Sequence, residues 1–484
     1  MNNSQTSFQL SDNVDQNKVF LVNLSDIEGR IDPIQFNSNR VAAIEKLSSN
    51  RILTKLSKVT ISNSNKVDES DLVYVGLENI QSHTGEYIFT QDKNGFGSAN
   101  IFNKGNILFP KLRPYLNKVY LAEFDGVCST EFHVLDSKGN FLNEFLAIYL
   151  RSELILNQTK YLMTGNTLPR LQTKDIADLP VPVINLDIQK KIVDTHSSFM
   201  RERSFKIQQA ENLLSSIDDY LLAELGIKVP DVDNSLPSRM FTVQASELSG
   251  GRFDAYRNKV YFQELQKVLE NHTNGSVPLK KYTKNMASGQ WGVDEEDGYD
   301  RDIYTKCLVI RATEFDNNGN LSFDENRIKY RLIENNKLKK MNILEHDLLI
   351  EKSGGSENQP VGRIAILTKN ILNDYGNIAY SNFVQKITVN STAISPVFLF
   401  YYLKTLHNIK FTEKMQSQTN GIRNLITSEY LDTPIINVDC QKQHEIVQHI
   451  DQIRATAAQL QQEANEILAQ AKQKIERMIL GEEN

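Results

Sequence analysis

The chain has 484 residues, of which 40% are hydrophobic and 24% charged, and its formal net charge is −6. This length predicts more than one domain, and the composition is that of a globular protein with several cores. No run of residues is long and apolar enough for a membrane span, and the first residues lack the pattern of a signal peptide. Three widely separated cysteines, in no metal-ligand spacing, favour a reducing compartment, so we expect a cytoplasmic protein.

The charges are unevenly distributed along the chain. Residues 104–118 contain several basic side chains and no acid, and residues 327–340 contain a second basic cluster with Glu334 as its only acid. Because electrostatic recognition is local, the negative overall charge does not exclude nucleic acid as a partner. It does argue against a binder that relies on charge alone.

The N-terminal region introduces the first sign of an internal duplication. Residues 1–17 are polar and are expected to be flexible. The segment 25–32, SDIEGRID, resembles 246–254, SELSGGRFD, and each precedes an expected helix, near 39–48 and 257–271. Two related segments followed by the same kind of element indicate a repeated unit.

Each half continues with short expected strands separated by Gly, Asn and Asp turns, followed by an apolar helical segment. The helical segments are 145–150 and 398–403, and two matched loops come next, GNTLPRL at 165–171 and NGIRNL at 420–425. Each loop leads through a proline-bearing connector into a long helix, so the order globule then helix occurs twice.

The two long helices are the clearest prediction. Apolar residues recur at alternating steps of three and four from Ile207 to Leu221 and from Ile450 to Ala471, as in the seam of a coiled coil. Gly226 and Gly481 follow the last periodic residues and suit helix C-caps. We therefore expect an α+β fold with pseudo-two-fold symmetry, in which the two helices pair as an antiparallel coiled coil. The expected globular domains are residues 18–185 and 227–438, and the expected helices are 186–226 and 439–484.

A search for catalytic motifs finds none. The chain lacks a Gly-x-Gly-x-x-Gly turn, a phosphate-binding loop, a His-Glu-x-x-His pair, a Gly-x-Ser-x-Gly elbow and the Asn-Pro-Pro-aromatic signature of amino-methyltransferases. Asp347 with Glu351 and Lys352 weakly resembles a nuclease set, but a strand that enters a glycine loop explains these residues better. We therefore expect a non-catalytic chain without a metal site.

What remains is a set of polar, basic loops that occurs once in each half. The run from Lys111 to Lys118 combines positive charge for phosphates with an aromatic ring and an Asn that could pair with a base edge. Its alternative interpretation is an ordinary solvated turn after a strand. The segment at 351–356 occupies the comparable place in the second half, and its glycines either close a turn or let the backbone approach a phosphate.

Two further pairs complete the candidate set. Arg170 and Arg423, in the matched loops, could contact phosphates or could brace the globule against its helix. Gln290 and Trp291 lie in a glycine-containing loop, although a lone Trp is more often a packing anchor. The candidate DNA-binding residues are Lys111, Arg113, Tyr115, Asn117, Lys118, Arg170, Gln290, Trp291, Lys352, Ser353, Gly354 and Arg423.

These motifs, in this order and duplicated, resemble the specificity subunit of type I restriction–modification systems. The resemblance rests on GNILFPKLRPYLNK at 105–118, STEF at 129–132, GNTLPRL at 165–171, LPVP at 179–182 and the helix that begins QKKIV at 189–193. The second half repeats them in weaker form, with KSGG at 352–355 and SNF at 381–383.

The resemblance implies a sequence-specific DNA-binding subunit that takes part in DNA methylation and phage defence. Each globule would be a target recognition domain reading one half of a split site in double-stranded DNA, and the helices would set the spacing. Two modification subunits would supply S-adenosylmethionine-dependent methyl transfer, and restriction subunits would use ATP and Mg²⁺, so this chain itself would hold no cofactor. Because the loops of the two halves differ, the two half-sites should differ in sequence.

Two other classes remain open from the residues alone. The chain could be a duplicated adaptor that binds protein, or a methyltransferase or nuclease with unrecognised motifs. Methyl transfer by the isolated chain would favour the enzyme, and binding that is lost at raised salt would favour DNA over an apolar protein partner.

Overall fold

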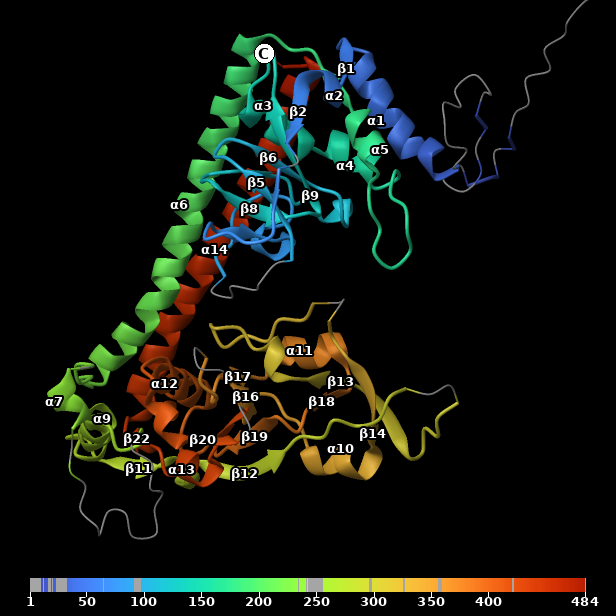
Figure 1. Cartoon of the computed structure of the whole chain (residues 1–484). Coiled ribbons are helices and arrows are strands. Elements are labelled where there is room, and N and C mark those ends of the chain that lie inside the picture. The colour runs from blue at the N-terminus through green and yellow to red at the C-terminus, as the bar shows by residue number, and fades with distance from the viewer. Residues whose placement is uncertain are drawn as a thin grey trace, which may run out of the picture. The chain divides into compact units, whose positions relative to one another are not determined.

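The computed structural model describes the two halves of the chain apart from several short segments (Figure 1). The described residues are 10, 11, 13–15, 19, 21, 22, 33–63, 65–90, 97–233, 235–240, 242, 256–295, 298–324, 327–355, 359–419 and 422–483. The related segments 25–32 and 246–254 lie outside them. No helix in the described ranges has the length and hydropathy that crossing a membrane requires.

The chain divides into two compact units, each of which contains part of both long helices. Unit 1 comprises residues 1–207 and 461–484, and unit 2 comprises residues 208–460. The long helices are α6, Leu186–Glu224, and α14, Cys440–Leu480. The sequence therefore predicted both helices at nearly their observed bounds.

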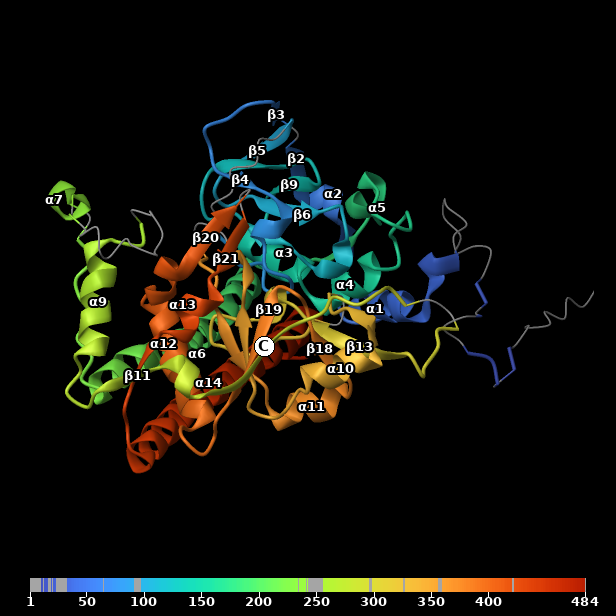
Figure 2. The same cartoon turned by 90° about the horizontal axis from the view of Figure 1, so that it is seen from below.

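Unit 1 consists of short strands with helices packed on one side. Its two four-stranded sheets have the orders β2-β9-β6-β7 and β3-β5-β8-β4, and β1 pairs with β10. Figure 2 shows β2, β6 and β9 of the first sheet and β3, β4 and β5 of the second. The strands are β1 Leu53–Lys55, β2 Thr60–Asn63, β3 Lys66–Val67, β4 Tyr74–Val75, β5 Ala99–Phe102, β6 Ile107–Pro110, β7 Tyr120–Leu121, β8 Gly126–Ser129, β9 Phe132–Ser137 and β10 Pro180–Pro182. The helices are η2 Pro33–Phe36, α1 Ser38–Ser48, α2 Leu56–Val59, η3 Leu77–Asn79, η4 Pro114–Leu116, α3 Asn143–Leu150, α4 Glu153–Thr159 and α5 Thr173–Ala177.

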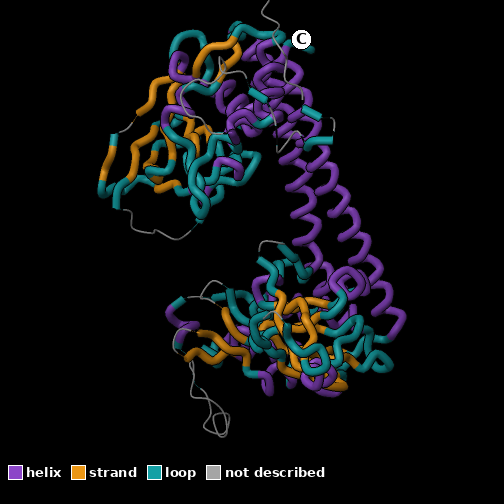
Figure 3. Tube along the Cα trace, turned by 90° about the vertical axis from the view of Figure 1, so that its right-hand side faces the viewer, coloured by secondary structure: helices purple, strands orange, loops and turns teal. Residues whose placement is uncertain are grey.

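Unit 2 repeats this arrangement with additions. Its sheets have the orders β12-β19-β15-β17, β14-β13-β18 and β16-β21-β20, and β11 pairs with β22. Figure 3 shows the strands of both units in orange among purple helices. The strands are β11 Ser276–Pro278, β12 Thr283–Ser288, β13 Tyr304–Ile310, β14 Tyr330–Glu334, β15 Leu348–Glu351, β16 Ser353–Gly355, β17 Ile364–Ile366, β18 Ile378–Tyr380, β19 Val384–Val389, β20 Gln416–Thr419, β21 Ile422–Leu425 and β22 Pro434–Ile436. The helices are α7 Leu236–Arg239, α9 Val260–Glu270, η5 Leu279–Lys281, η6 Ala312–Glu314, α10 Asn335–Met341, α11 Lys369–Tyr375, α12 Pro396–Asn408, η7 Phe411–Met415 and α13 Thr427–Leu431.

The central strand of each unit is buried on both faces. In β6, Ile107 packs with α3 and the long helices, whereas Leu108 packs against the second sheet. In β15, Leu348 and Leu349 divide between two cores in the same way. Two-sided burial explains why these strands read as continuous apolar runs and not as alternating ones.

Strand register aligns the two units residue by residue. Ile107 pairs with Leu135 in unit 1, and Leu348 pairs with Ile387 in unit 2. The Tyr149 hydroxyl donates to the carbonyl of Pro180, and the Tyr402 hydroxyl donates to that of Pro434 at 3.0 Å. The internal duplication that the sequence predicted is thus present in the elements and in the hydrogen bonds that join them.

Within each unit the two long helices pack antiparallel. In unit 1, Lys206 pairs with Glu463 at 2.6 Å, while the earlier residue Ile192 packs with the later residue Ile475. In unit 2, Lys442 pairs with Glu224, and the rings of Tyr220 and His449 lie 4.2 Å apart. A later position on α6 therefore meets an earlier position on α14, as the predicted antiparallel pairing requires.

Both long helices end at the predicted glycines. Gly226 and Gly481 have φ of 65° and 78°, the left-handed conformation that a C-cap requires. The Arg51 guanidinium donates to the carbonyl of Ile479 at 2.8 Å, and a ring nitrogen of His272 lies 2.8 Å from that of Leu225. Polar groups thus satisfy the last carbonyls, which a helix leaves unpaired.

A buried glutamine joins each globule to the start of its long helix. The Gln189 amide donates to the carbonyls of Asn140 and Ile184, and its oxygen accepts from the Leu142 N–H. Gln443 repeats this pattern, because its oxygen accepts from the Ser395 N–H at 2.8 Å and its amide donates to a nearby carbonyl. Both side chains are almost fully buried, so these bonds are made where water cannot replace them.

A buried ion pair distinguishes the central sheet of unit 2. Lys386 is fully buried, and its amine donates to Asp347 at 2.8 Å as well as to the Asn342 carbonyl and the Thr388 hydroxyl. By strand register, the corresponding residues of unit 1 are Asn106 and Val134. The same position is therefore apolar in one unit and charged in the other.

This difference predicts a compensating pair of substitutions. Lys386→Met should destabilise the protein by about 3–5 kcal/mol, because it leaves the Asp347 carboxylate buried without its partner. Adding Asp347→Asn should recover most of that loss, since the double variant approaches the neutral pair of unit 1. Denaturant unfolding measures the free energy of unfolding of both variants. A double variant as unstable as Lys386→Met would contradict the view that the unpaired Asp347 carboxylate causes the loss.

Candidate nucleic-acid interface

The segment 111–113 is held to two other segments of unit 1 through its backbone. The Lys111 N–H donates to the Glu131 carbonyl at 2.8 Å, and the Lys111 carbonyl accepts from the Leu171 N–H at 2.9 Å. The Arg113 N–H donates to the Pro169 carbonyl at 2.8 Å. These bonds bring together three motifs that the sequence places as much as 60 residues apart, from Lys111 to Leu171.

The same bonds recur in unit 2. The Lys352 N–H donates to the Phe383 carbonyl and the Lys352 carbonyl accepts from the Leu425 N–H, each at 2.8 Å. Lys352 therefore corresponds to Lys111, as the motif order predicted. Arg170, however, corresponds to Asn424 and not to Arg423, because Leu171 and Leu425 are the residues that align.

A concave surface of unit 1 lies beside the 111–113 segment. Its volume is about 500 Å³, and it is bordered by β2, β3, β5 and β9 together with the 164–171 loop. Its principal polar lining consists of Asn63, Lys66, Asn100, Lys111, Glu131, His133 and Arg170. Three cations and one carboxylate give this surface a local excess of positive charge.

The charged groups of this concave surface are arranged by two contacts. Arg170 donates through Nε and Nη2 to the Glu131 carboxylate, with Nη2–Oε1 at 2.9 Å. Burial lowers the pKa of Lys111, and the nearby Glu131 opposes that shift. Lys111 makes no side-chain ion pair or hydrogen bond within the described part of the chain, so its ammonium remains available for an anion.

His133 adds a neutral polar group to the same surface. Burial, followed by the charge of Lys111, lowers the pKa of His133 to about 4. Its imidazole is therefore uncharged near neutral pH and carries both a donor and an acceptor. Its Nε2 has no hydrogen-bond partner within the described residues.

The remaining candidates of unit 1 fall into two groups. Arg113 and Tyr115 are exposed and could reach a ligand. Asn117 is buried and donates to the Arg151 carbonyl at 2.8 Å, and Lys118 donates to the Leu77 carbonyl at 2.7 Å. The fold thus already engages both side chains, and their predicted contacts with a base and a phosphate stay predictions.

The candidates of unit 2 divide in the same way. Lys352 is partly exposed, whereas Ser353 is buried and its hydroxyl donates to the Asn424 side chain at 2.6 Å. Gly354 is exposed with φ of 115°, a conformation that favours glycine. Arg423 lies on β21 opposite Gly355. Ser353 is thus a structural residue, while the others remain candidates.

Gln290 and Trp291 lie close to this region of unit 2. The Gln290 N–H donates to the Tyr380 carbonyl, three residues before the Phe383 carbonyl that holds Lys352. Both line a hollow of about 370 Å³, and the Arg331 guanidinium lies 4.7 Å from the centre of the Trp291 ring. The Trp291 ring therefore already makes a cation–π contact within the protein. The Gln290 side chain is exposed and lines the hollow.

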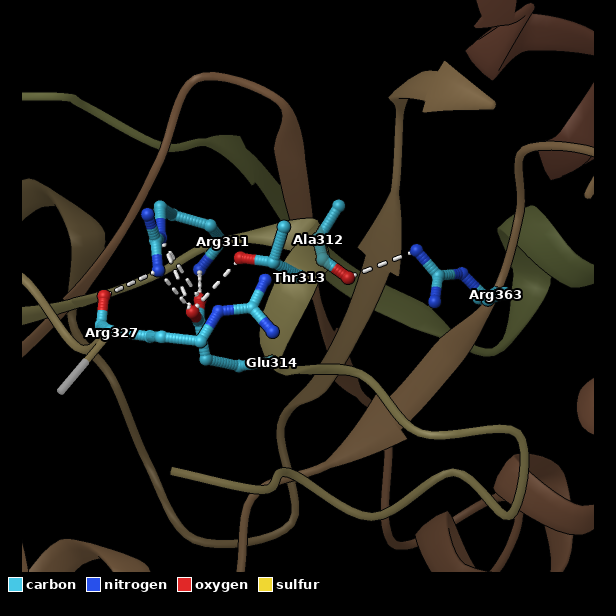
Figure 4. A network of polar contacts seen from close by, with 6 residues as sticks. All are labelled: Arg311, Ala312, Thr313, Glu314, Arg327 and Arg363. Atoms are coloured by element: carbon cyan, nitrogen blue, oxygen red, sulfur yellow. Dashed lines mark hydrogen bonds and ion pairs between the residues drawn. The ribbon is translucent and has the colours of Figure 1, made fainter. Parts of the chain in front are cut away.

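The nuclease-like set near Asp347 is instead a pair of structural ion pairs. Asp347 pairs with Lys386, and Glu351 pairs with Arg363 at 2.9 Å. Figure 4 shows the adjoining network, in which Arg363 donates to the Ala312 carbonyl and Arg311 binds Glu314. Within the described ranges, no group of His, Cys, Asp and Glu residues is placed to hold a metal ion.

Sequence reasoning missed several lining residues of unit 1. Lys66, Asn100 and His133 lie on β3, β5 and β9, so they meet only when the strands assemble. No local motif marks them, because each sits alone in an ordinary strand. The nearest signal in the sequence is the STEF motif at 129–132, which ends one residue before His133.

Comparison with known proteins gives a match over the first half of the chain. Residues 50–213 match the family described as the type I restriction modification DNA specificity domain. The type I restriction enzyme EcoDI specificity subunit of Escherichia coli is 26% identical over 211 residues, which cover 40% of this chain and 47% of that protein. The matching region thus spans about half the length of this curated relative.

Two chains from solved structures also match most of the length of this chain. A chain from a structure of a type I R-M system is 19% identical, with a TM-score of 0.47 over 90% of this chain and 97% of that one. The HsdS subunit of Thermoanaerobacter tengcongensis is 19% identical, with a TM-score of 0.33 over 90% of this chain and 96% of that one.

The family match covers the segments that carry the motifs of the first half. It includes the 105–118 run, the 129–132 run, the matched loop at 165–171 and the first part of α6. The predicted resemblance to type I specificity subunits is confirmed, since residues 50–213 match the type I restriction modification DNA specificity domain family.

Proposed function

We propose that this chain reads a bipartite DNA site as the specificity subunit of a type I restriction–modification complex. The observation that carries the proposal is the concave, cationic surface of unit 1, which the 111–113, 131–133 and 164–171 segments build together. Lysine and arginine side chains suit phosphates, and the amide of Asn63 offers a donor and an acceptor to base edges.

The repeated backbone bonds of unit 2 extend this proposal to a second half-site. Lys352 occupies the place of Lys111, but Asn424 stands where unit 1 has Arg170. A neutral amide and a guanidinium present different donors and acceptors, so the two half-sites should differ in sequence. The expected target is asymmetric and split.

The partners and the division of labour are part of the same proposal. Modification subunits would bind S-adenosylmethionine and transfer the methyl group, and restriction subunits would use ATP and Mg²⁺. The target base must leave the helical stack to reach the methyltransferase site, so this chain would bind DNA in a way that permits base flipping. The chain itself would position the DNA and contribute no catalytic residue.

Substitutions in unit 1 should affect one half-site only. Arg113→Ala and Lys111→Ala should each weaken DNA binding by the complex and reduce the salt dependence by about one phosphate contact, because a cation near the backbone is lost. The measurement is a titration of duplexes that carry single substitutions in either half-site. Recognition of the second half-site should be unchanged.

Lys58→Ala provides the matched control for these variants. Lys58 is exposed on α2 and does not line the concave surface. It should leave affinity and salt dependence as in the wild type. If Lys58→Ala and Lys111→Ala lose equal DNA affinity, the effect is one of general charge, and the concave surface is not the DNA-binding site.

The long helices should set the spacing between the half-sites. Inserting four residues into both α6 and α14 adds about 6 Å, roughly two base pairs of DNA. We expect the preferred spacer to lengthen while both half-sites keep their sequence, as read from methylated sites. A spacer that stays constant despite the insertion would rule out this role.

A further inference from the structure

Unit 2 contains a second polar pocket that the proposed DNA-reading surface does not use. It has a volume of about 220 Å³ and lies at the C-terminal end of α12. Its charged and titratable lining residues are Asp316, Arg363, Lys404, His407 and Lys410. Both the size and the lining suit a small polar ligand.

Lys404 is the central residue of this pocket. Its side chain lies on α12, and the residue is only 8% exposed. Within the described part of the chain it makes no ion pair or hydrogen bond, and its amine is not among the fully enclosed polar atoms. The amine therefore borders the pocket, where a buried cation without a partner is costly.

Burial also affects the titration of Lys404. It lowers the pKa of the Lys404 amine, and Arg454 acts in the same direction, whereas Asp218 and Asp316 oppose the shift. A bound anion would favour the charged amine and relieve the cost of its burial.

The acidic groups near the pocket are already engaged by other donors. Asp316 accepts from the N–H groups of Asn318 and Asn320 at 2.8 and 2.7 Å. Asp218 accepts from the Thr405 hydroxyl and the Asn408 amide, at 2.6 and 2.7 Å. The carboxylates are therefore held by the fold and leave the Lys404 amine unpaired.

The other basic residues complete a positively charged environment. Arg363 donates to the Ala312 carbonyl (Figure 4), and it is also held by Glu351 and by the Phe315 carbonyl. It therefore adds positive charge to the pocket but offers no free donor. Lys410 is exposed at the rim. Burial lowers the pKa of His407 to about 4, so this imidazole is neutral near neutral pH.

The duplication supplies an internal comparison for this site. Tyr149 and Tyr402 occupy corresponding positions, because each hydroxyl donates to the carbonyl of the first residue of β10 or β22. Two residues further along the chain, unit 1 has Arg151 and unit 2 has Lys404. Arg151 donates to the Val119 carbonyl at 3.3 Å and lines a cavity of only about 50 Å³. The larger pocket with an unpaired cation is thus a property of unit 2.

We propose that this pocket binds a phosphate group, with the Lys404 amine as its main contact and Lys410 at its entrance. At about 30 Å³ of liquid volume for each water molecule, a pocket of this size has room for a phosphate group with several waters. Charge-assisted hydrogen bonds from ammonium groups are among the stronger contacts that proteins make to phosphate. The phosphate could be inorganic or part of a DNA backbone, and the proposal does not depend on the DNA-reading surface of unit 1.

Titration of the full chain with inorganic phosphate tests this proposal. Phosphorus NMR and thermal unfolding would be followed while chloride keeps the ionic strength constant. We expect saturable binding that raises the melting temperature of the wild type, and an affinity lower by roughly tenfold or more in Lys404→Met, since one charge-assisted contact is lost. Lys410→Glu, at an exposed position, should weaken binding without affecting the fold.

Lys267→Glu is the matched control, because it reverses the charge of an exposed lysine on α9 outside the pocket. It should bind phosphate like the wild type. Wild-type protein that responds no more to phosphate than to chloride, or equal affinity in Lys410→Glu and Lys267→Glu, would overturn the proposal. If Lys404→Met does not fold, Lys410→Glu decides.

Duplex DNA distinguishes the two sources of the phosphate once the site is established. A loss of duplex affinity in Lys410→Glu, relative to Lys267→Glu, would assign the phosphate to the DNA backbone. Unchanged duplex affinity together with lost phosphate binding would assign it to a free anion. Both results support a phosphate site in this pocket.

Discussion

The burial of one glutamine at each junction between globule and helix is the constraint on which the architecture depends. Gln189 and Gln443 each use both ends of the amide, so the chain leaving the globule and the first turn of the helix are fixed together. An amide buried in this way cannot exchange its partners for water, and losing one partner costs about 1–3 kcal/mol. The direction in which each long helix leaves its globule is therefore set by hydrogen bonds that occur in both units.

This shared framework leaves other positions free to differ. The bonds around Lys111 and Lys352 are the same, yet the neighbouring residues are Arg170 in one unit and Asn424 in the other. The sheet beneath carries Val134 in unit 1 and the charged Lys386 in unit 2. A duplicated scaffold whose backbone hydrogen bonds are retained and whose side chains diverge is well suited to recognising two different sequences.

Sequence periodicity predicted the long helices and their glycine caps because those features depend on local spacing. Motif order likewise predicted that Lys111 and Lys352 correspond. The matched loops left the residue-by-residue alignment open, and only the bonds to Leu171 and Leu425 show that Arg170 corresponds to Asn424. Local sequence contains no information about which distant strand a loop will meet.

The roles of individual side chains were the hardest to predict, for the same reason. Asn117 and Lys118 lie in the most suggestive basic run, but carbonyl groups of Arg151 and Leu77 engage them in the folded chain. Lys66 belongs to the concave surface although no motif lies near it in the sequence, and His133 lies there although the STEF motif ends one residue before it. Burial and assembly of strands decide these roles, and neither is visible in a motif.

The central claim is that this chain selects a split, asymmetric DNA site for partner enzymes. The most direct test is to express it together with a type I modification subunit from the same organism and to sequence the methylated positions in cellular DNA. We predict one asymmetric bipartite motif with a spacer of constant length, which disappears when this chain is omitted. Methylation that is absent, or that persists unchanged without this chain, would contradict the account.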